Sequence, residues 1–329
     1  MIRAVKARID LDRGVRGALS TRYARTRARR RLRPCARLID VPTVTPFLVV
    51  ESHSSGAHRY AILQPDGPTW VEELATVYRE LRTATTIPLD LTVLDGLDVV
   101  DPSALRDRLV STQITTRSTA KGPASNFAVE RSDLAEVALA LAGEQLRGYT
   151  YGYRSTRDRE LAAAPGRSID QIGVAQGEAN GHPVIYLSLG EAKLSSAVAA
   201  PPSVVDAAND SLRKQHIAHL NEREATAGKI LHAMRLAPEP RAQKLLQMAA
   251  LLWDDENLEY LAVRCTSMLV RPRHGSPADY GSFNDSPTDF EPGEIDFMVL
   301  RLDVDDVDPV IDEFLSRARN EFVTEGTPS

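Results

Sequence analysis

Two charged residues follow an apolar row near the middle of the chain. Residues 184–196, VIYLSLGEAKLSS, alternate between apolar and small or polar side chains, which is typical of a half-buried β-strand. In such a strand Glu191 and Lys193 continue the apolar row. Burying a charge is costly unless a partner compensates it. We therefore expect both side chains at the rim of the core, where a functional site requires them.

A predicted hairpin brings a second acid opposite Glu191. Residues 168–176 are predicted as the preceding strand, and Asn180-Gly181 favours a two-residue turn. Counting outward from this turn places Asp170 opposite Glu191 on the apolar face. Directly opposed residues have Cβ atoms about 4.5–5.5 Å apart. A four-residue turn centred elsewhere would shift this pairing.

The opposed carboxylates of Asp170 and Glu191 favour a metal ion. Two such groups at the edge of a core repel each other and are expensive to remove from water. A divalent cation between them resolves both costs, and oxygen ligands suit Mg²⁺ or Mn²⁺. Lys193 then lies on the same face, within reach of an attacking water. The alternative is a solvated strand end with a salt bridge, because Glu-x-Lys is common by chance.

Glu136 is a third acidic candidate. It lies in the predicted helix 131–148, with Ala140 and Gly143 one and two turns later on its own face. Small neighbours would let another backbone or a substrate approach the carboxylate. The alternative is a capping box, with Asp133 as the N-cap and Glu136 at the N3 position.

Other potential ligands are weaker. His216 and His219 are spaced i, i+3, but without a cysteine or third ligand nearby we interpret them as a solvated helix face. The acidic stretch 303–308 lacks the central glycine and final glutamate of a calcium loop, so we interpret it as the cap of the last helix. The chain has no Walker A sequence and no G-x-G-x-x-G, so we expect no nucleotide cofactor of its own.

The charge is unevenly distributed over the 329 residues. Residues 1–40 carry 13 Lys and Arg against three Asp, which leaves 27 basic and 42 acidic residues in the rest. Residues 22–37 could form a nucleic-acid arm, but we interpret residues 1–43 as a basic, disordered N-terminal extension. The acidic body disfavours indiscriminate DNA binding, so DNA contact would need a local basic cleft or a partner.

Composition also restricts the compartment. No apolar run approaches the roughly 18–20 residues of a membrane span, so we expect no membrane contact. Cys35 and Cys265 form neither a disulfide framework nor a zinc site. This cysteine content fits a reducing cytoplasm.

Strands and helices alternate along the chain without a strict βαβ rhythm, which predicts an α/β fold with a mixed central sheet flanked by helices. Strands are predicted at 45–52, 58–64, 87–100, 168–176, 184–194, 258–270 and 295–304. Helices are predicted at 69–83, 101–110, 131–148, over most of 203–235, at 240–252 and at 308–322, with a polar linker at 115–125 and a loop at 272–292.

The order of these motifs resembles a known nuclease core. A helix bearing an acid, then SIDQIGVA, a turn and YLSLGEAKLSS are similar to the PD-(D/E)xK nuclease superfamily. More closely, residues 131–220 resemble the C-terminal domain of the HamA family, the nuclease-like subunit of the Hachiman antiphage defence system. Ile169 stands where the motif has proline, a departure that the superfamily tolerates.

The resemblance implies a restriction-endonuclease-like core and a role for each candidate. Asp170 and Glu191 would be metal ligands together with the carbonyl of Ala192, and Lys193 would be the catalytic lysine. Glu136 would be the first-helix acid, completing a second metal position or holding a ligand. The cofactor would be Mg²⁺ or Mn²⁺, the substrate DNA, and the partner a superfamily II helicase.

The implied organisation has four regions. These are the extension 1–43, an N-terminal α/β region 44–125, the nuclease-like core 126–235, and a helix-strand-strand-helix region 236–329 that packs on the core. Two other functions stay open: a silent nuclease-shaped module that regulates a helicase, and a sequence-specific DNA-binding protein. The intact acidic and lysine set argues against the first, and the acidic body argues against the second.

Overall fold

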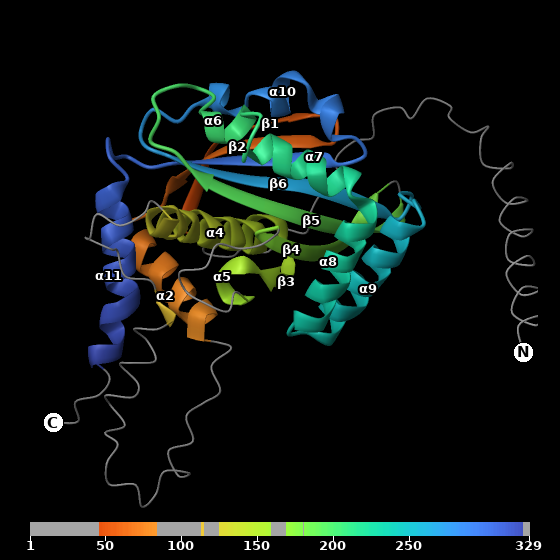
Figure 1. Cartoon of the computed structure of the whole chain (residues 1–329), viewed down its shortest axis with the longest axis horizontal. Coiled ribbons are helices and arrows are strands. Elements are labelled where there is room, and N and C mark those ends of the chain that lie inside the picture. Colours follow the sequence, from red (N-terminus) through yellow and green to blue (C-terminus); the bar gives the residue numbers. More distant parts are fainter. Residues whose placement is uncertain (1–45, 84–112, 115–124, 159–168, 180, 325–329) are drawn as a thin grey trace, which may run out of the picture. The chain divides into compact units, whose positions relative to one another are not determined.

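A seven-stranded sheet with the order β1-β2-β7-β6-β5-β4-β3 organises the described part of the chain (Figure 1). The computed structural model describes residues 46–83, 113–114, 125–158, 169–179 and 181–324. The strands are β1 (Phe47–Ser55), β2 (His58–Pro65), β3 (Thr150–Arg154), β4 (Gln171–Ala179), β5 (His182–Leu194), β6 (Leu261–Arg271) and β7 (Glu294–Arg301).

Helices flank this sheet. The longer ones are α2 (Trp70–Thr83), α4 (Ser125–Arg147), α7 (Leu212–Asn221), α8 (Arg223–Leu236), α9 (Pro240–Asp254) and α11 (Asp308–Thr324). The short ones are α5 (Ser155–Asp158), α6 (Ser203–Asp206), α10 (Ser282–Asp285) and the 3₁₀ turns η2 (Pro277–Tyr280) and η3 (Pro287–Phe290). None of the described helices is long and apolar enough to cross a membrane.

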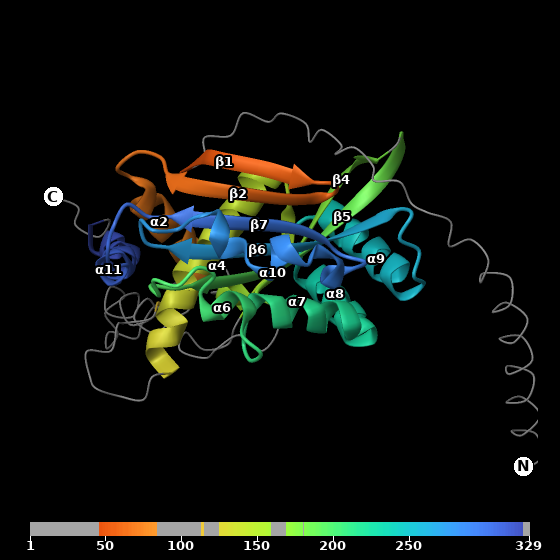
Figure 2. The ribbon, with the colours of Figure 1, turned by 90° about the horizontal axis from the view of Figure 1, so that it is seen from above.

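The sheet is mixed. Strands β5, β6, β7 and β2 pair in parallel, and they lie side by side in Figure 2. The pairs β1–β2, β3–β4 and β4–β5 are antiparallel. Parallel neighbours need crossover connections, and α6 to α9 supply the one between β5 and β6. The protein is therefore an α/β protein with a mixed sheet packed against helices, as the alternation of elements predicts.

Successive side chains of each strand point to opposite faces of the sheet, and each face contributes to its own apolar layer. One layer joins the sheet to α2, α4 and α11, and it includes Ala192 of β5 and Met298 of β7. The other joins the opposite face to α7, α8 and α9, and it includes Leu187 and Leu189 of β5. Because successive side chains point to opposite faces, Glu191 lies on the α7 side of the sheet.

The predicted regions share this one sheet. The region 44–125 supplies β1 and β2, the region 126–235 supplies β3 to β5, and the region 236–329 supplies β6 and β7. The predicted extension 1–43, the strand at 87–100, the helix at 101–110, most of the linker, and Asn180 of the turn lie outside the described residues.

Three local predictions differ from the structure. The strand β3 was not predicted, and α4 begins at Ser125 rather than at residue 131. The loop 272–292 contains three short helical turns, η2, α10 and η3. The predicted end of α4 is confirmed, because Gly148 follows it with a positive φ of 69°, which favours glycine.

Candidate functional site

The hairpin of β4 and β5 has the register predicted from its sequence. Ala179 pairs with His182, and the last pair of the ladder joins Gln171 to Gly190. Gly181 has a φ of 76°, a left-handed conformation that favours glycine in a tight turn. Asp170 and Glu191 are the next residues beyond that last pair.

Asp170 and Glu191 are close enough to influence each other's ionisation. The Asp170 carboxylate accepts a hydrogen bond of 2.9 Å from the backbone N–H of Ala192. Burial raises the pKa of Asp170 well above its usual value, and the charges of Glu191 and Glu136 raise it further. Burial raises the pKa of Glu191 to about 8, although the charge of Lys193 opposes this shift.

One carboxylate oxygen of Glu191 has no hydrogen-bond partner among the described residues. Its Oε1 atom lies 2.7 Å from Nε2 of His219, whereas Oε2 is buried without a hydrogen-bond partner among the described residues. A buried carboxylate oxygen without a donor is costly. Coordination of a cation would compensate that cost, so the donor chemistry of Asp170 and Glu191 fits Mg²⁺ or Mn²⁺.

The protein ligands at this position are few. Within the described part of the chain, no group of three or more His, Cys, Asp or Glu side chains is arranged to hold a metal ion. Mg²⁺ in phosphoryl-transfer enzymes is often bound by one or two carboxylates, with water and substrate phosphate completing the shell. A pair of carboxylates therefore suffices for this kind of site.

Lys193 lies on the same strand face as Glu191, and its ammonium forms an ion pair with Asp210. The distance from Nζ to Oδ1 is 3.0 Å, and the side chain of Asp210 is 79% exposed. Exposed ion pairs contribute about 0–1 kcal/mol, so this pair opens at small cost. The lysine is therefore held near the carboxylates without being locked.

Glu136 projects from α4 into a group of hydroxyls that we call the hydroxyl cage, formed by Ser132, Ser155 and Thr156. Its Oε1 atom accepts a hydrogen bond of 2.6 Å from Ser132, and Oε2 accepts one from Ser155 and one of 2.5 Å from Thr156. The capping-box alternative is wrong, because α4 begins at Ser125 and Glu136 lies inside the helix.

The turn from β3 into α5 links Glu136 to Asp170. The backbone N–H of Ser155 donates to the carbonyl of Asp170 at 2.7 Å, while the Ser155 hydroxyl donates to Glu136. The amide of Gln171 also donates to the backbone carbonyl of Glu136. This turn therefore fixes the distance between α4 and the start of β4.

Buried contacts with α2 hold these elements in place. Tyr78 donates a hydrogen bond of 2.7 Å to the carboxylate of Asp133, which anchors the interior of α4. Arg82, almost fully buried, donates one of 2.8 Å to the carbonyl of Thr156. The space beside Gly143 on the same helix is occupied by the ring of Tyr151 from β3, not by the backbone or substrate that the small residues led us to expect.

The histidines of α7 are buried, so their interpretation as a solvated helix face is wrong. His216 is 0% exposed and bonds Ser267 through Nε2 at 2.8 Å, and His219 is 7% exposed and bonds Glu191. Burial, with a smaller contribution from the charge of Lys229, lowers the pKa of His219 to about 4. The imidazole is therefore neutral near pH 7, and a proton on Nε2 lets it donate to Glu191.

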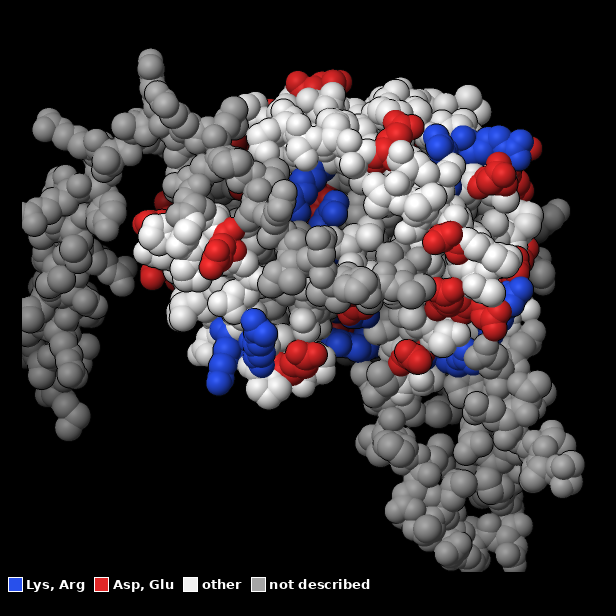
Figure 3. Space-filling model, turned by 180° about the vertical axis from the view of Figure 1, so that it is seen from behind, with Lys and Arg blue, Asp and Glu red and all other residues white. Residues whose placement is uncertain are grey.

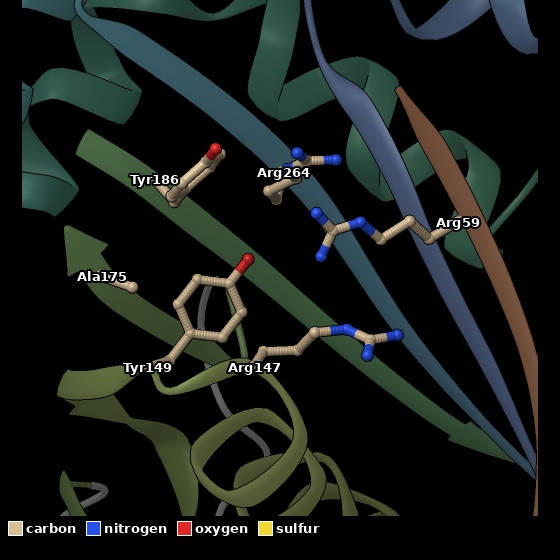
Figure 4. Close-up of a pocket in the computed structure, with 6 residues that line it drawn as sticks. All are labelled: Arg59, Arg147, Tyr149, Ala175, Tyr186 and Arg264. Carbon is tan, nitrogen blue, oxygen red and sulfur yellow. The ribbon is translucent and has the colours of Figure 1, made fainter. Parts of the chain in front are cut away.

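A second polar cluster, the arginine pocket, lies on the opposite face of the sheet. Figure 4 shows the side chains of Arg59, from β2, and Arg264, from β6, extending into the same space. The cavity holds about 10 Å³, room for one water. It is lined by Arg59, Arg147, Tyr149, Ala175, Tyr186 and Arg264.

The arginine pocket is largely neutralised from within. Arg147 makes two bonds of 2.7 and 2.9 Å to the buried carboxylate of Asp296. Arg264 pairs with Glu294 at 2.7 Å. Burial alone would raise the pKa of Asp296, but the charge of Arg147 and its hydrogen bonds outweigh burial and lower the pKa. We therefore interpret this cluster as a structural tie between α4 and β7.

A scan of protein-family models and a search of curated proteins both find no match to this chain.

Proposed function

We propose that this protein is a metal-dependent DNA nuclease that hydrolyses phosphodiester bonds. The observation that supports the proposal most is the pair of carboxyl groups on Asp170 and Glu191, whose pKa values are both raised. Such a pair is an unfavourable arrangement unless a cation joins it. Lys193 on the same strand face supplies the amine that phosphodiester hydrolysis needs.

Asp170 and Glu191 would hold Mg²⁺ or Mn²⁺, with the Ala192 carbonyl as a further oxygen ligand and Glu136 at a second position. When bound, the ion would supply Lewis-acid stabilisation of the scissile phosphate and lower the pKa of water. His219 would keep the Glu191 carboxylate in its ligating orientation through their hydrogen bond.

Lys193 would orient the attacking water and stabilise the negative charge that builds on the phosphate oxygens. To do so its ammonium must leave Asp210, and the exposed side chain of Asp210 makes that exchange inexpensive. Incoming phosphate would compete for the same cation, so substrate itself would release the lysine.

The finer fold and the biological role belong to the same proposal. The mixed sheet, the acid-bearing helix α4 and the β4–β5 hairpin are compatible with a restriction-endonuclease-like PD-(D/E)xK core. The motif resemblance suggests the effector subunit of a Hachiman-type antiphage system with a superfamily II helicase partner. Figure 3 shows a face on which acidic and basic side chains are scattered in small groups, which fits DNA delivery by a partner.

A catalytically silent module that binds and regulates a helicase is the second candidate. The ammonium of Lys193 is paired with Asp210 in this structure, an arrangement that is also compatible with a non-catalytic role. The small number of acidic ligands among the described residues favours it.

A plasmid assay separates the two candidates. Supercoiled DNA is incubated with Mg²⁺ or Mn²⁺, with and without the helicase, and Glu191→Ala and Lys193→Ala are compared with the wild type. Lys244→Ala serves as the matched control, since Lys244 is an exposed lysine on α9. Cleavage that both site variants abolish and the control retains supports the nuclease. Equal cleavage by wild type and site variants, or none under any condition, favours the silent module.

A further inference from the structure

A groove opens beside the acidic pair, between the edge of the sheet and α8. It has a volume of about 370 Å³ and is lined by Tyr153 of β3, Ile172 of β4, and Ala225, Gly228, Lys229 and His232 of α8. We call it the α8 groove. Its volume lies within the roughly 300–1,000 Å³ of small-molecule sites.

One lining residue of the α8 groove lies close in the chain to the candidate metal site. Ile172 of β4 follows Asp170 by two residues, and it pairs with Leu189, two residues before Glu191. Lys229 of α8 contributes a cation to the lining of this groove.

Small residues keep the groove open. Gly228 lies inside α8, where glycine costs about 1 kcal/mol relative to alanine. A Cβ atom at Gly228 would meet nothing within 4 Å among the described residues, so packing does not require glycine there. Ala225, one turn earlier, is equally short. The helix therefore gives up stability at the position where a side chain would project into the groove.

The remaining lining residues have side chains that can bind a nucleotide. The rings of Tyr153 and His232 both line the groove, and their centroids are 6.1 Å apart with the planes inclined by 54°. Bases stack on such aromatic faces whatever their sequence. Lys229 supplies a cation of the kind that binds a backbone phosphate.

We propose that the α8 groove receives an unpaired nucleotide of the DNA strand next to the scissile phosphate, with its base on Tyr153 or His232 and its phosphate at Lys229. The inference rests on the proposed nuclease function and deepens it, because it makes single-stranded DNA the substrate. A duplex keeps its bases stacked inside and cannot fill this groove without melting.

Binding is measured without cleavage, so that it can be separated from the nuclease proposal. Fluorescence anisotropy of a labelled 12-nucleotide single strand and its duplex is followed at low salt with EDTA, in the Glu191→Gln background. We expect the single strand to bind about tenfold more tightly than the duplex. Filling the groove with Gly228→Leu, or removing the ring with Tyr153→Leu, should weaken single-strand binding about tenfold.

Matched variants distinguish a loss of DNA binding in the groove from a loss of folding. Gly228→Ala has nearly the helix propensity of Gly228→Leu but adds a single methyl group, and Tyr153→Phe keeps the ring; each should bind the single strand more tightly than the leucine variant at the same position. Lys229→Gln should weaken binding more than Lys244→Gln. Equal binding by Gly228→Leu and Gly228→Ala, equal affinity for strand and duplex, or no DNA binding at all would overturn the groove assignment. Plasmid cleavage by the wild type together with any of these results would leave the nuclease proposal intact.

Discussion

The Nε2 atom of His219 lies 2.7 Å from the Oε1 atom of Glu191, and both side chains are buried. The two residues come from α7 and β5 and are 28 positions apart in the chain. A buried carboxylate that is held by a neutral imidazole keeps a fixed direction, and its second oxygen, Oε2, has no hydrogen-bond partner in the described structure. His219 therefore acts on the acidic site through Glu191.

Removing that imidazole should weaken the site without abolishing it. We expect His219→Ala to raise the Mg²⁺ concentration needed for half-maximal cleavage about 10- to 100-fold, the usual effect of losing a residue that supports a metal ligand. His219→Gln, which can return a donor to Glu191, should recover much of the loss. Titration of cleavage against Mg²⁺ checks this, and identical curves for Ala and Gln would refute the positioning role.

Magnesium should stabilise the fold, and more so at higher pH. Because the pKa values of Asp170 and Glu191 are raised, the metal-free pair retains protons that a cation must displace. At a free Mg²⁺ concentration about tenfold above the dissociation constant, the gain is about 1.4 kcal/mol, or a Tm rise of a few degrees. Thermal melts at pH 6 and pH 8 measure it. Glu191→Gln should show no Mg²⁺-dependent shift; a shift that persists in this variant would place the ion elsewhere.

The hydroxyl cage should affect both stability and cleavage, because its hydroxyls bind the carboxylate of Glu136. Thr156→Val keeps the shape of a buried side chain but removes its hydrogen bond to that carboxylate. We expect a loss of about 1–2 kcal/mol in the free energy of unfolding. We also expect slower cleavage, because Glu136 would be less firmly oriented.

Urea denaturation and plasmid cleavage measure the two effects. Thr69→Val is the control, since Thr69 bonds the carboxylate of Glu73 on the exposed surface. Cleavage by Thr156→Val as fast as by Thr69→Val would count against a role for the cage.

The tie between Arg147 and Asp296 predicts acid sensitivity. The pKa of Asp296 is lowered in the folded protein, so its contribution to stability is present above the usual pKa of aspartate and is lost as the pH falls through the folded value. Asp296→Asn should cost about 3–5 kcal/mol near neutral pH, because it leaves the Arg147 charge buried without a partner. The deficit relative to wild type should shrink below pH 4. A deficit that is constant from pH 3 to pH 7 would contradict this account.

Two glycines near α8 should respond in opposite directions to alanine. A Cβ atom at Gly152 of β3 would lie 2.5 Å from the carbonyl oxygen of Ala233 and 2.5 Å from Cδ1 of Leu246, so Gly152→Ala should destabilise by about 1–3 kcal/mol. Gly228→Ala should stabilise by about 0.5–1 kcal/mol, since the space beyond it is open. Thermal melts of the two variants test the sign of each effect.

The parts of the structure that local sequence determines could be predicted. The β4–β5 register follows from Asn180-Gly181 and from strict alternation, and pairing is confirmed out to Gln171 and Gly190. The same register places Asp170 and Glu191 directly beyond the last pair of the ladder. The end of α4 was equally readable, because Gly148 provides the left-handed residue that terminates helices.

Other features depend on contacts between distant elements. The KQHIAHL segment does not indicate which face of α7 is buried. His216 and His219 are buried because α7 packs against β5 and β6. Strand β3 has five residues, too few for a period to stand out, and Ser155 and Thr156 belong to no motif. The Ser-Asp pair at 132–133 resembles a cap, yet α4 continues through it because Asp133 bonds Tyr78.

The last strand of the sequence, β7, lies between β2 and β6, and Asp296 on it holds the end of α4. A chain synthesised only through β5 and the helices that follow it therefore lacks β6 and β7, the two strands that join β2 to β5 in the sheet. The acidic residues are translated early, but the frame that fixes them closes only after residue 301 has emerged. A truncated chain that ends before β7 would therefore carry Asp170 and Glu191 without the strand that joins β2 to β6, and without Asp296, which binds the end of α4.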